Sequence, residues 1–238
     1  MHYPAPLVRG TLLRRYKRFL ADIELETGER VIAHCPNPGS MAALAEPGAQ
    51  VWLSPADNPK RKLQWTWELV RDAATGSMVG INTGRANAIA EEALRAGSVE
   101  KAFAEASVRR EVRYGESSRV DFLVSPDTGP PCYLEIKSVT LRRSATAPHI
   151  AEFPDAVTAR GARHLQELAA VSASGNRAML LYLVQREDCE TVRVAADIDP
   201  AYATAAKMAR EAGVEFRALG CRISPAGIAA AAPLPVEI

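Results

Sequence analysis

The stretch RVDFLVSPDTGPPCYLEIKSVT, from Arg119 to Thr140, decides the fold of the second half of this chain. Apolar and polar residues alternate from Arg119 to Val124, as they do along a β-strand with one buried face. The segment from Ser125 to Pro131 has the composition of a turn. The stretch therefore predicts a β-hairpin. One side of its first strand carries Val120, Phe122 and Val124, and the other side carries Asp121 and Leu123. One face of the return strand carries Cys132, Leu134 and Ile136, and the opposite face carries Tyr133, Glu135 and Lys137.

Three chemically active side chains converge on this hairpin. Residues two apart on a strand are separated by about 7 Å, and paired strands by about 4.8 Å, so Asp121 can reach the same volume as Glu135 and Lys137. Two carboxylates suit Mg²⁺, which keeps several waters that a phosphate can displace, and a nearby lysine can polarise the attacking water. The arrangement predicts a metal-dependent nuclease site. The alternative is a solvated strand face of alternating charge.

Composition limits the other possibilities. The 238 residues suffice for two domains, and 47% hydrophobic with 24% charged residues is ordinary for a soluble protein. The sequence has no apolar run of membrane-spanning length and no secretory signal pattern, so we expect a cytoplasmic protein without a membrane partner. Four scattered cysteines without a CxxC pair predict reduced thiols. A net charge of +1 means that nucleic-acid binding must depend on local clusters.

Residues 1–80 predict a small barrel of OB type, although other small barrels fit the same pattern. Alternation over residues 7–26 predicts one long bent strand, and further short strands follow at Val31–His34, Val51–Leu53 and Met78–Asn82. Basic and aromatic side chains on exposed strands of such a barrel bind nucleic acid through its phosphates and bases. The candidate binding residues are Arg14, Arg15, Lys17, Arg18, Lys60, Arg61, Lys62 and Trp65. The alternative is that the basic residues only solubilise and that the core contains Tyr16, Trp52, Trp65 and Trp67.

Residues 81–238 predict a mixed sheet flanked by helices. A helix spans residues 83–95, with Thr83 as its cap and an apolar stripe flanked by Glu91 and Glu92. A strand at Val108–Tyr114 precedes the hairpin, and a loop with Arg142 and Arg143 follows it as a candidate lid or DNA clamp. The remaining elements are a helix from Asp155 or Thr158 to Ser172, a buried strand at Met179–Gln185, a helix from Asp199 to Gly213 and a strand at Val214–Leu219.

Several segments in this order resemble the sugar fermentation stimulation protein A family of bacteria and archaea, described as DNA-binding proteins. They include RYKRFLAD at residues 15–22, CPNPGSM at 35–41, YLEIKSVTL at 133–141 and FPDAVTARG at 153–161. The resemblance covers nearly the whole chain. It implies an α/β protein with an OB-like N-terminal domain, residues 1–80, followed by a restriction-endonuclease-like PD-(D/E)xK domain, residues 81–238.

The resemblance also implies roles for individual residues. Asp121 matches the first acid of the motif, Glu135 the second acid and Lys137 the lysine, while Val120 replaces the leading proline. Related sequences keep an acid at the position of Glu92. Three further residues fall in family-like segments, with a helix cap or a solvated helix face as their alternative roles: Asp155, Arg160 and His164.

The leading hypothesis is a DNA-binding protein with a phosphodiesterase site that uses Mg²⁺ or Mn²⁺. The metal ligands would be Glu92, Asp121, Glu135 and the backbone carbonyl of Ile136, and Lys137 would activate water. The rival hypothesis is a non-catalytic DNA-binding regulator of sugar metabolism that reuses the nuclease fold. A third is a structural adaptor for protein partners. The sequence does not decide whether the nucleic acid is DNA or RNA, which base sequence the protein prefers, or what its oligomeric state is.

Overall fold

The N-terminal strands close into a barrel. The computed structural model describes residues 1–115, 118–143 and 149–238. The barrel strands pair in the order β3-β2-β1-β4-β5, and β3 pairs again with β5, so five strands form a closed OB-type barrel as predicted. They are β1 (Val8–Tyr16), β2 (Leu20–Leu25), β3 (Arg30–His34), β4 (Gln50–Pro55) and β5 (Trp65–Arg71), and β6 (Met78–Gly80) pairs with the C-terminal end of β5.

The single long strand predicted over residues 7–26 is wrong, because the chain turns back between β1 and β2. Lys17 and Arg18 form the turn with φ values of 47° and 65°. Glycine, asparagine and aspartate enter this left-handed region most readily, so neither residue signals a turn in the sequence. The alternating pattern continues through the turn and conceals it.

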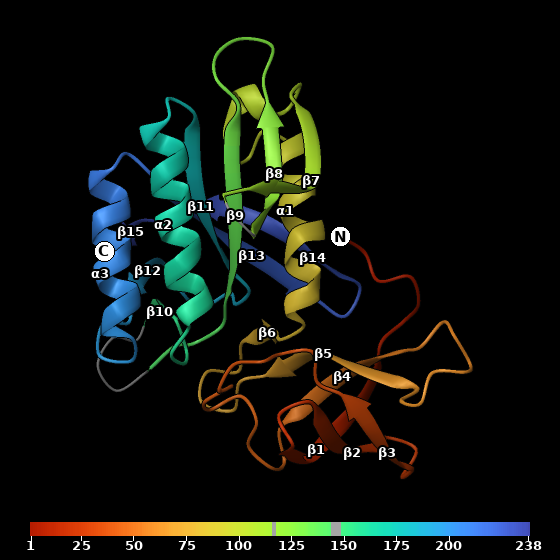
Figure 1. The fold of residues 1–238 in the computed structure, drawn as a ribbon. Helices are drawn as coiled ribbons and strands as arrows, with labels where there is room; N and C mark the ends of the chain where they lie inside the picture. The colour runs from red at the N-terminus through yellow and green to blue at the C-terminus, as the bar shows by residue number, and fades with distance from the viewer. Residues whose placement is uncertain (116–117, 144–148) are drawn as a thin grey trace.

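The second domain is built on a six-stranded mixed sheet in the order β14-β13-β11-β9-β8-β7. Its strands are β7 (Ser107–Tyr114), β8 (Ser118–Ser125), β9 (Cys132–Val139), β11 (Arg177–Val184), β13 (Glu215–Ser224) and β14 (Gly227–Pro233). The central strands β9, β11 and β13 are parallel, and the predicted hairpin is formed by β8 and β9. Helix α1 (Ala86–Arg95) lies on one face of the sheet, and α2 (Ala159–Ala173) and α3 (Pro200–Glu211) cover the other (Figure 1).

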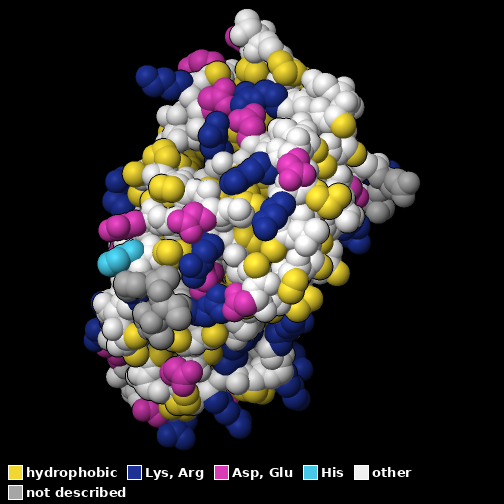
Figure 2. Space-filling model, turned by 90° about the vertical axis from the view of Figure 1, so that its left-hand side faces the viewer, with side chains coloured by type: hydrophobic (Ala, Val, Ile, Leu, Met, Phe, Trp, Pro, Cys, Tyr) yellow, Lys and Arg dark blue, Asp and Glu magenta, His cyan; other side chains and the backbone are white. Residues whose placement is uncertain are grey.

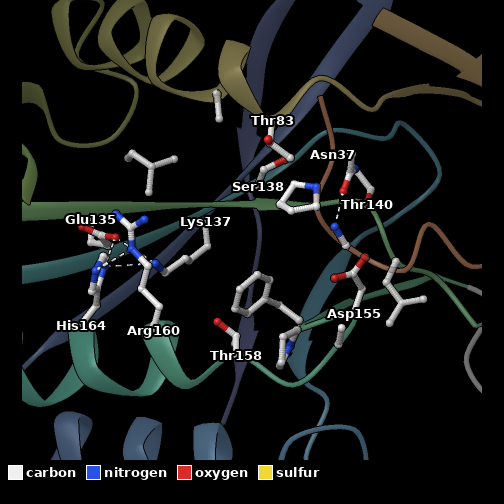
Figure 3. Close-up of a pocket in the computed structure, with 18 of the residues that line it drawn as sticks. Asn37, Thr83, Glu135, Lys137, Ser138, Thr140, Asp155, Thr158, Arg160 and His164 are labelled. Carbon is white, nitrogen blue, oxygen red and sulfur yellow. Dashed lines mark hydrogen bonds and ion pairs between the residues drawn. The ribbon is translucent and has the colours of Figure 1, made fainter. Parts of the chain in front are cut away.

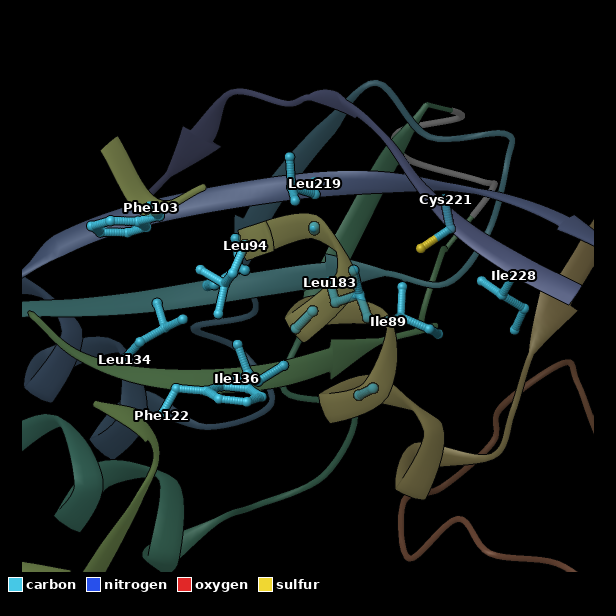
Figure 4. Close-up of a cluster of buried hydrophobic side chains, with 14 of the residues drawn as sticks. Ile89, Leu94, Phe103, Phe122, Leu134, Ile136, Leu183, Leu219, Cys221 and Ile228 are labelled. Atoms are coloured by element: carbon cyan, nitrogen blue, oxygen red, sulfur yellow. The ribbon is translucent and has the colours of Figure 1, made fainter. Parts of the chain in front are cut away.

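Strand β11 supplies apolar side chains to both faces. Leu181 and Leu183 join the cluster under α1, which also contains Ile89 and Phe122 (Figure 4). Tyr182 belongs to the cluster under α2 and α3. Burial on both faces explains why this strand is continuously apolar in the sequence, and it confirms the predicted interior position.

The helix starts follow local capping. A 3₁₀ turn, η1 (Thr83–Arg85), precedes α1 and is capped by Asn82 rather than by Thr83. The backbone N–H of Gly161 donates to Thr158 at the start of α2, and the N–H of Tyr202 donates to Asp199 at the start of α3. Of the two caps proposed for α2, the structure therefore selects Thr158. None of the described helices is long and apolar enough to cross a membrane.

The sequence pattern missed the shorter elements. These are η2 (Lys101–Phe103), strand β14 and a parallel three-stranded sheet of β10 (Ile150–Phe153), β12 (Thr191–Val194) and β15 (Val236–Glu237). The predicted lid falls partly on residues 144–148, outside the described residues. On its described part, Arg143 pairs with Glu152 and Asp197, and Arg142 pairs with Asp188.

Buried polar contacts join the barrel to the second domain. Arg186, only 2% exposed, donates to Asp72 of the barrel at 2.7 Å and also to Asp188. The backbone N–H of Gly80 donates to the carbonyl of Gln185 at 2.9 Å. These contacts connect the two domains, and a cavity that residues of both domains line lies at their junction.

Candidate active site

A cavity of about 510 Å³ lies where the barrel meets the N-terminal ends of α1 and α2. The second domain lines it with Asp121, Glu135 and Lys137, and the barrel contributes Arg18 and the loop from Asn37 to Gly39 (Figure 3). The predicted hairpin trio therefore lies at a cavity wall rather than on a solvated strand face.

Glu135 and Lys137 project from β9 toward α2, as the period of the strand requires (Figure 3). The ammonium of Lys137 donates to Oε1 of Glu135 at 2.9 Å, and Glu135 is only 3% exposed. Burial acts to raise the pKa of Glu135, but the hydrogen bond from His164 and the charge of Lys137 outweigh it and hold the pKa below its usual value. The other oxygen, Oε2, is buried and has no hydrogen-bond partner among the described residues.

A chain of hydrogen bonds from α2 orients the carboxylate of Glu135. Nε of Arg160 donates to Nε2 of His164 at 3.2 Å, and Nδ1 of His164 bonds Oε1 of Glu135. Because a guanidinium only donates, Nε2 must accept, so the imidazole proton lies on Nδ1 and His164 donates to Glu135. His164 is 3% exposed, which rules out the solvated helix face that the sequence left open for it.

Asp121 is held by one contact from the neighbouring strand β9 and one from helix α1. Oδ2 accepts a hydrogen bond from the backbone N–H of Ile136 at 2.8 Å, and Oδ1 accepts one from the side-chain amide of Asn87 on α1 at 2.8 Å. Burial and the nearby charge of Glu135 raise the pKa of Asp121. A cation between the two carboxylates would relieve this repulsion.

Asp121 lies where successive β8 side chains pack on opposite faces of the sheet. Glu111 of β7 lies between the residues that pair with Val120 and Phe122, and it has a φ of 54°. Val120 packs under α2, whereas Phe122 packs under α1. The prediction that these two side chains share one face is therefore wrong, and Asp121 lies at the change of face between them.

Glu92 does not join the site. Its side chain is 61% exposed, and its carboxylate accepts a hydrogen bond from the amino group of Met1. The neighbouring Glu91 pairs with Arg95 and Arg110, also outside the cavity. The polar residue that α1 brings to the cavity is Asn87, five positions before Glu92. The sequence prediction considered only acids on this helix, so it passed over Asn87, whose side chain is an amide.

The donors for a metal are few. Within residues 1–115, 118–143 and 149–238, no three His, Cys, Asp or Glu side chains are placed to hold a metal ion. Two of the carboxylates at the cavity, Asp121 and Glu135, nevertheless fit a hard cation, because Glu135 keeps one unpartnered oxygen and because burial and then the charge of Glu135 raise the pKa of Asp121. Mg²⁺ needs only one or two protein carboxylates when waters complete its shell. The backbone carbonyl of Ile136 stays the predicted third ligand.

The barrel residues predicted to bind nucleic acid divide into two groups. Arg15 is structural, because its guanidinium donates to the backbone carbonyls of Arg18, Asn37, Gly39 and Ser40 and so holds the cavity loop. Arg14 pairs with Asp22 at 2.6 Å and lies over the ring of Tyr16. The exposed residues of the set are Arg14, Lys17, Arg18, Lys60, Arg61 and Lys62. Figure 2 shows Lys and Arg side chains gathered around the lower end of the molecule, where the barrel lies in Figure 1.

The tryptophans belong mainly to the interior. Trp67 is fully buried and its indole N–H donates to the carbonyl of Leu69 at 2.9 Å, and Trp52 is 6% exposed. Trp65 is half-buried against the barrel core. The core alternative therefore holds for Trp52 and Trp67, while stacking by Trp65 stays a prediction.

The loop at Gly39 brings the barrel close to the start of α2. A Cβ atom at Gly39 would lie 2.1 Å from Oδ2 of Asp155, so any larger residue there would have to displace the Asp155 side chain. The hydroxyl of Ser40 donates to the same carboxylate oxygen at 3.4 Å. Asp155 thus contacts the barrel instead of capping α2.

Comparison with known proteins agrees with this architecture. Residues 13–81 match the family model described as the SfsA N-terminal OB domain, and residues 84–227 match the sugar fermentation stimulation protein RE domain. The sugar fermentation stimulation protein homolog of Ruegeria sp. (strain TM1040) is 50% identical over 228 residues, which cover 96% of this chain and 97% of the relative. That of Maricaulis maris (strain MCS10) is 49% identical over 238 residues, covering 100% and 99%.

A solved structure extends the similarity to the whole fold. The structure of Pyrococcus furiosus SfsA in complex with Ca²⁺ is 29% identical, with a TM-score of 0.87 over 100% of this chain and 98% of that chain. Both domains, their order and nearly the full length are shared with these relatives. The chain belongs to the sugar fermentation stimulation protein family.

Proposed function

We propose that this chain binds nucleic acid and hydrolyses phosphodiester bonds with Mg²⁺ or Mn²⁺ at the cavity between its domains. The observation that carries the proposal is the convergence of Asp121, Glu135 and Lys137 at the cavity wall, with Oε2 of Glu135 left without a partner. The Pyrococcus furiosus protein forms a complex with Ca²⁺, which supports the proposal because Ca²⁺ and Mg²⁺ both prefer oxygen ligands.

The residues divide the chemistry between them. A divalent cation held by Asp121 and Glu135 would neutralise phosphate charge and lower the pKa of a neighbouring water. In the proposed hydrolysis a water oxygen would bond to phosphorus while the ester P–O bond breaks, and the leaving oxygen would take up the proton that the attacking water loses. The ammonium of Lys137 stabilises the negative charge that develops at phosphorus. Arg160 and His164 keep Glu135 in place throughout.

A nuclease assay with Mn²⁺ or Mg²⁺ tests the proposal. The substrates are single-stranded, duplex and branched DNA, and RNA. We expect the wild type to cut at least one of them. Lys137→Ala should abolish cutting but keep binding, because Lys137 acts mainly on charge that develops in the transition state. Lys207→Ala, an exposed lysine on α3, is the matched control and should cut normally. If Lys137→Ala cuts as fast as the wild type, the activity does not belong to this site.

One observation favours the non-catalytic alternative. Glu92 is absent from the cavity and Asn87 takes its expected place, so only two of the three predicted acids, Asp121 and Glu135, line the cavity. On this alternative the chain binds nucleic acid and regulates without cutting it. Wild-type protein that binds metal and nucleic acid but cuts no substrate of the panel would establish the alternative.

A further inference from the structure

The turn between β1 and β2 presents charge and an aromatic ring beside the cavity. Arg18 lines the cavity, and the next residue, Phe19, is 42% exposed. Lys17 and Arg18 both adopt left-handed backbone conformations, which cost free energy for residues with a side chain. A strained turn of this kind, with an exposed Phe at its end, places these side chains outside the barrel rather than in its core.

A second aromatic ring, that of His34 on β3, lies next to Phe19 on the barrel. The rings of Phe19 and His34 are 6.5 Å apart between centroids and tilted by 35°. On the neighbouring strand β5, Thr66 is the register partner of His34. The hydroxyl of Thr66 accepts a hydrogen bond from the guanidinium of Arg61 at 2.8 Å. Burial and then the charge of Arg61 lower the pKa of His34, so its ring is neutral at physiological pH. We call Arg18, Phe19, His34 and Arg61 the barrel strip.

The opposite rim of the cavity also carries an exposed apolar side chain. Val157 lines the cavity just before α2 and is 77% exposed. Among the described residues, the large hydrophobic side chains that are exposed are those of Phe19, Ile32, Val157 and Met208. Of these four, Val157 lines the cavity from the second domain, and Phe19 of the barrel follows directly after the lining residue Arg18.

The burial of the site restricts what can reach it. Glu135 is 3% exposed and the side chain of Lys137 is 14% exposed, so a phosphate must enter the cavity to meet them. A cavity of about 510 Å³ admits a group of nucleotide size. A single strand bends readily and exposes its bases, whereas a duplex is stiff over this length and keeps its bases paired.

We propose that the substrate is a single-stranded nucleic acid that runs from the cavity along the barrel strip. One phosphate enters the cavity beside Asp121 and Glu135, the following phosphate meets Arg18, and the bases stack on Phe19 and His34 and continue toward Arg61. This inference rests on the function proposed above, because it assigns the strand class to that same site. It makes the β1–β2 turn, rather than Trp65, the principal stacking surface.

Binding without cutting tests the barrel strip. Fluorescence anisotropy in EDTA compares a labelled oligodeoxythymidylate with a labelled duplex of mixed sequence. We expect the single strand to bind at least tenfold more tightly than the duplex. Phe19→Ala should weaken single-strand binding about 5- to 100-fold, the loss expected for one stacked base, and Phe19→Trp should restore it. Met208→Ala removes a similarly exposed side chain from α3 and should bind like the wild type.

Two results would overturn the inference while leaving the nuclease proposal intact. One is that the wild type binds the duplex more tightly than the single strand. The other is that Phe19→Ala keeps the wild-type affinity for the single strand while the wild type cuts nucleic acid. Circular dichroism of Phe19→Ala checks that the barrel is folded, and Phe19→Trp supplies a second folded variant. Conversely, a wild type that binds the single strand through Phe19 but cuts nothing with Mn²⁺ supports the barrel strip and rejects the nuclease.

Discussion

The carboxylate of Glu135 uses its two oxygens differently. Oε1 accepts hydrogen bonds from His164 and Lys137, whereas Oε2 is buried without a partner among the described residues. A buried acceptor left unsatisfied costs about 1–3 kcal/mol, and more when it is charged. Asp121, with its raised pKa, lies at the same cavity. The unpartnered oxygen of Glu135 and the raised pKa of Asp121 both mean that the charged carboxylates destabilise the metal-free protein. A bound cation would give both carboxylates an opposite charge and so offset this cost.

We therefore expect Mg²⁺ or Mn²⁺ to raise the melting temperature in differential scanning calorimetry. At a hundredfold excess over Kd, binding adds about 2.7 kcal/mol to the free energy of unfolding. Asp121→Asn and Glu135→Gln should lose this increment. Glu92→Gln is the matched control and should keep it in full, because Glu92 is bound to the amino group of Met1. An unchanged metal response in Asp121→Asn and Glu135→Gln would place the ion elsewhere.

The β1–β2 turn is an element whose conformation its own sequence does not favour. Lys17 has a φ of 47°. Lys17→Gly should raise the free energy of unfolding by about 0.5–1 kcal/mol, because glycine removes the left-handed strain but adds freedom to the unfolded chain. Urea denaturation measures the change as a shift of the midpoint at constant slope.

Lys62→Gly is the control for this substitution. Lys62 is equally exposed, and its φ is not among the positive values of the described residues, so glycine should give no gain there. A loss of stability in Lys17→Gly would mean that the side chain of Lys17 makes contacts that outweigh the backbone strain.

The elements also show why sequence patterns predicted one part of the site and missed another. A hairpin is local, so period-two alternation was enough to bring Asp121, Glu135 and Lys137 together. The rotation of α1 about its axis depends on packing against β9 and β14, which the apolar stripe specifies only within one or two positions. The stripe alone therefore did not show that Asn87, and not Glu92, faces the cavity. Lys17 in the turn and Glu111 in β7 are positive-φ positions without glycine, and no local pattern indicates them.

At the scale of the molecule, the two domains share buried charge. Arg186 bonds Asp72 of the barrel and Asp188 of its own domain. Burial acts to raise the pKa of Asp188, but the hydrogen bonds and charge of Arg186 outweigh it and lower the pKa from 3.8 to about 2. A lowered pKa means that the folded state favours the charged carboxylate.

The stability from Asp188 should therefore be present above pH 4 and be lost as the pH falls toward 2. We expect about 1–2 kcal/mol from this group, allowing for solvent screening. Acid unfolding followed by circular dichroism should show a shallower loss over this range in Asp188→Asn than in the wild type. Asp127→Asn, an exposed position on the hairpin turn, should follow the wild-type curve. Identical curves for Asp188→Asn and the wild type would contradict the assignment.

The contact at Gly39 has a consequence for how this protein can change over evolutionary time. Because a single methyl group at residue 39 would collide with Asp155, a loop on one domain is fitted to a carboxylate on the other. A chimaera could join this barrel to the second domain of a distant relative. The chimaera would keep the contact between the domains only if the residues at positions 39 and 155 still fit each other. Recombination at the domain boundary should therefore fail more often than the modular appearance of the chain implies, and the two domains should diverge together as a matched pair.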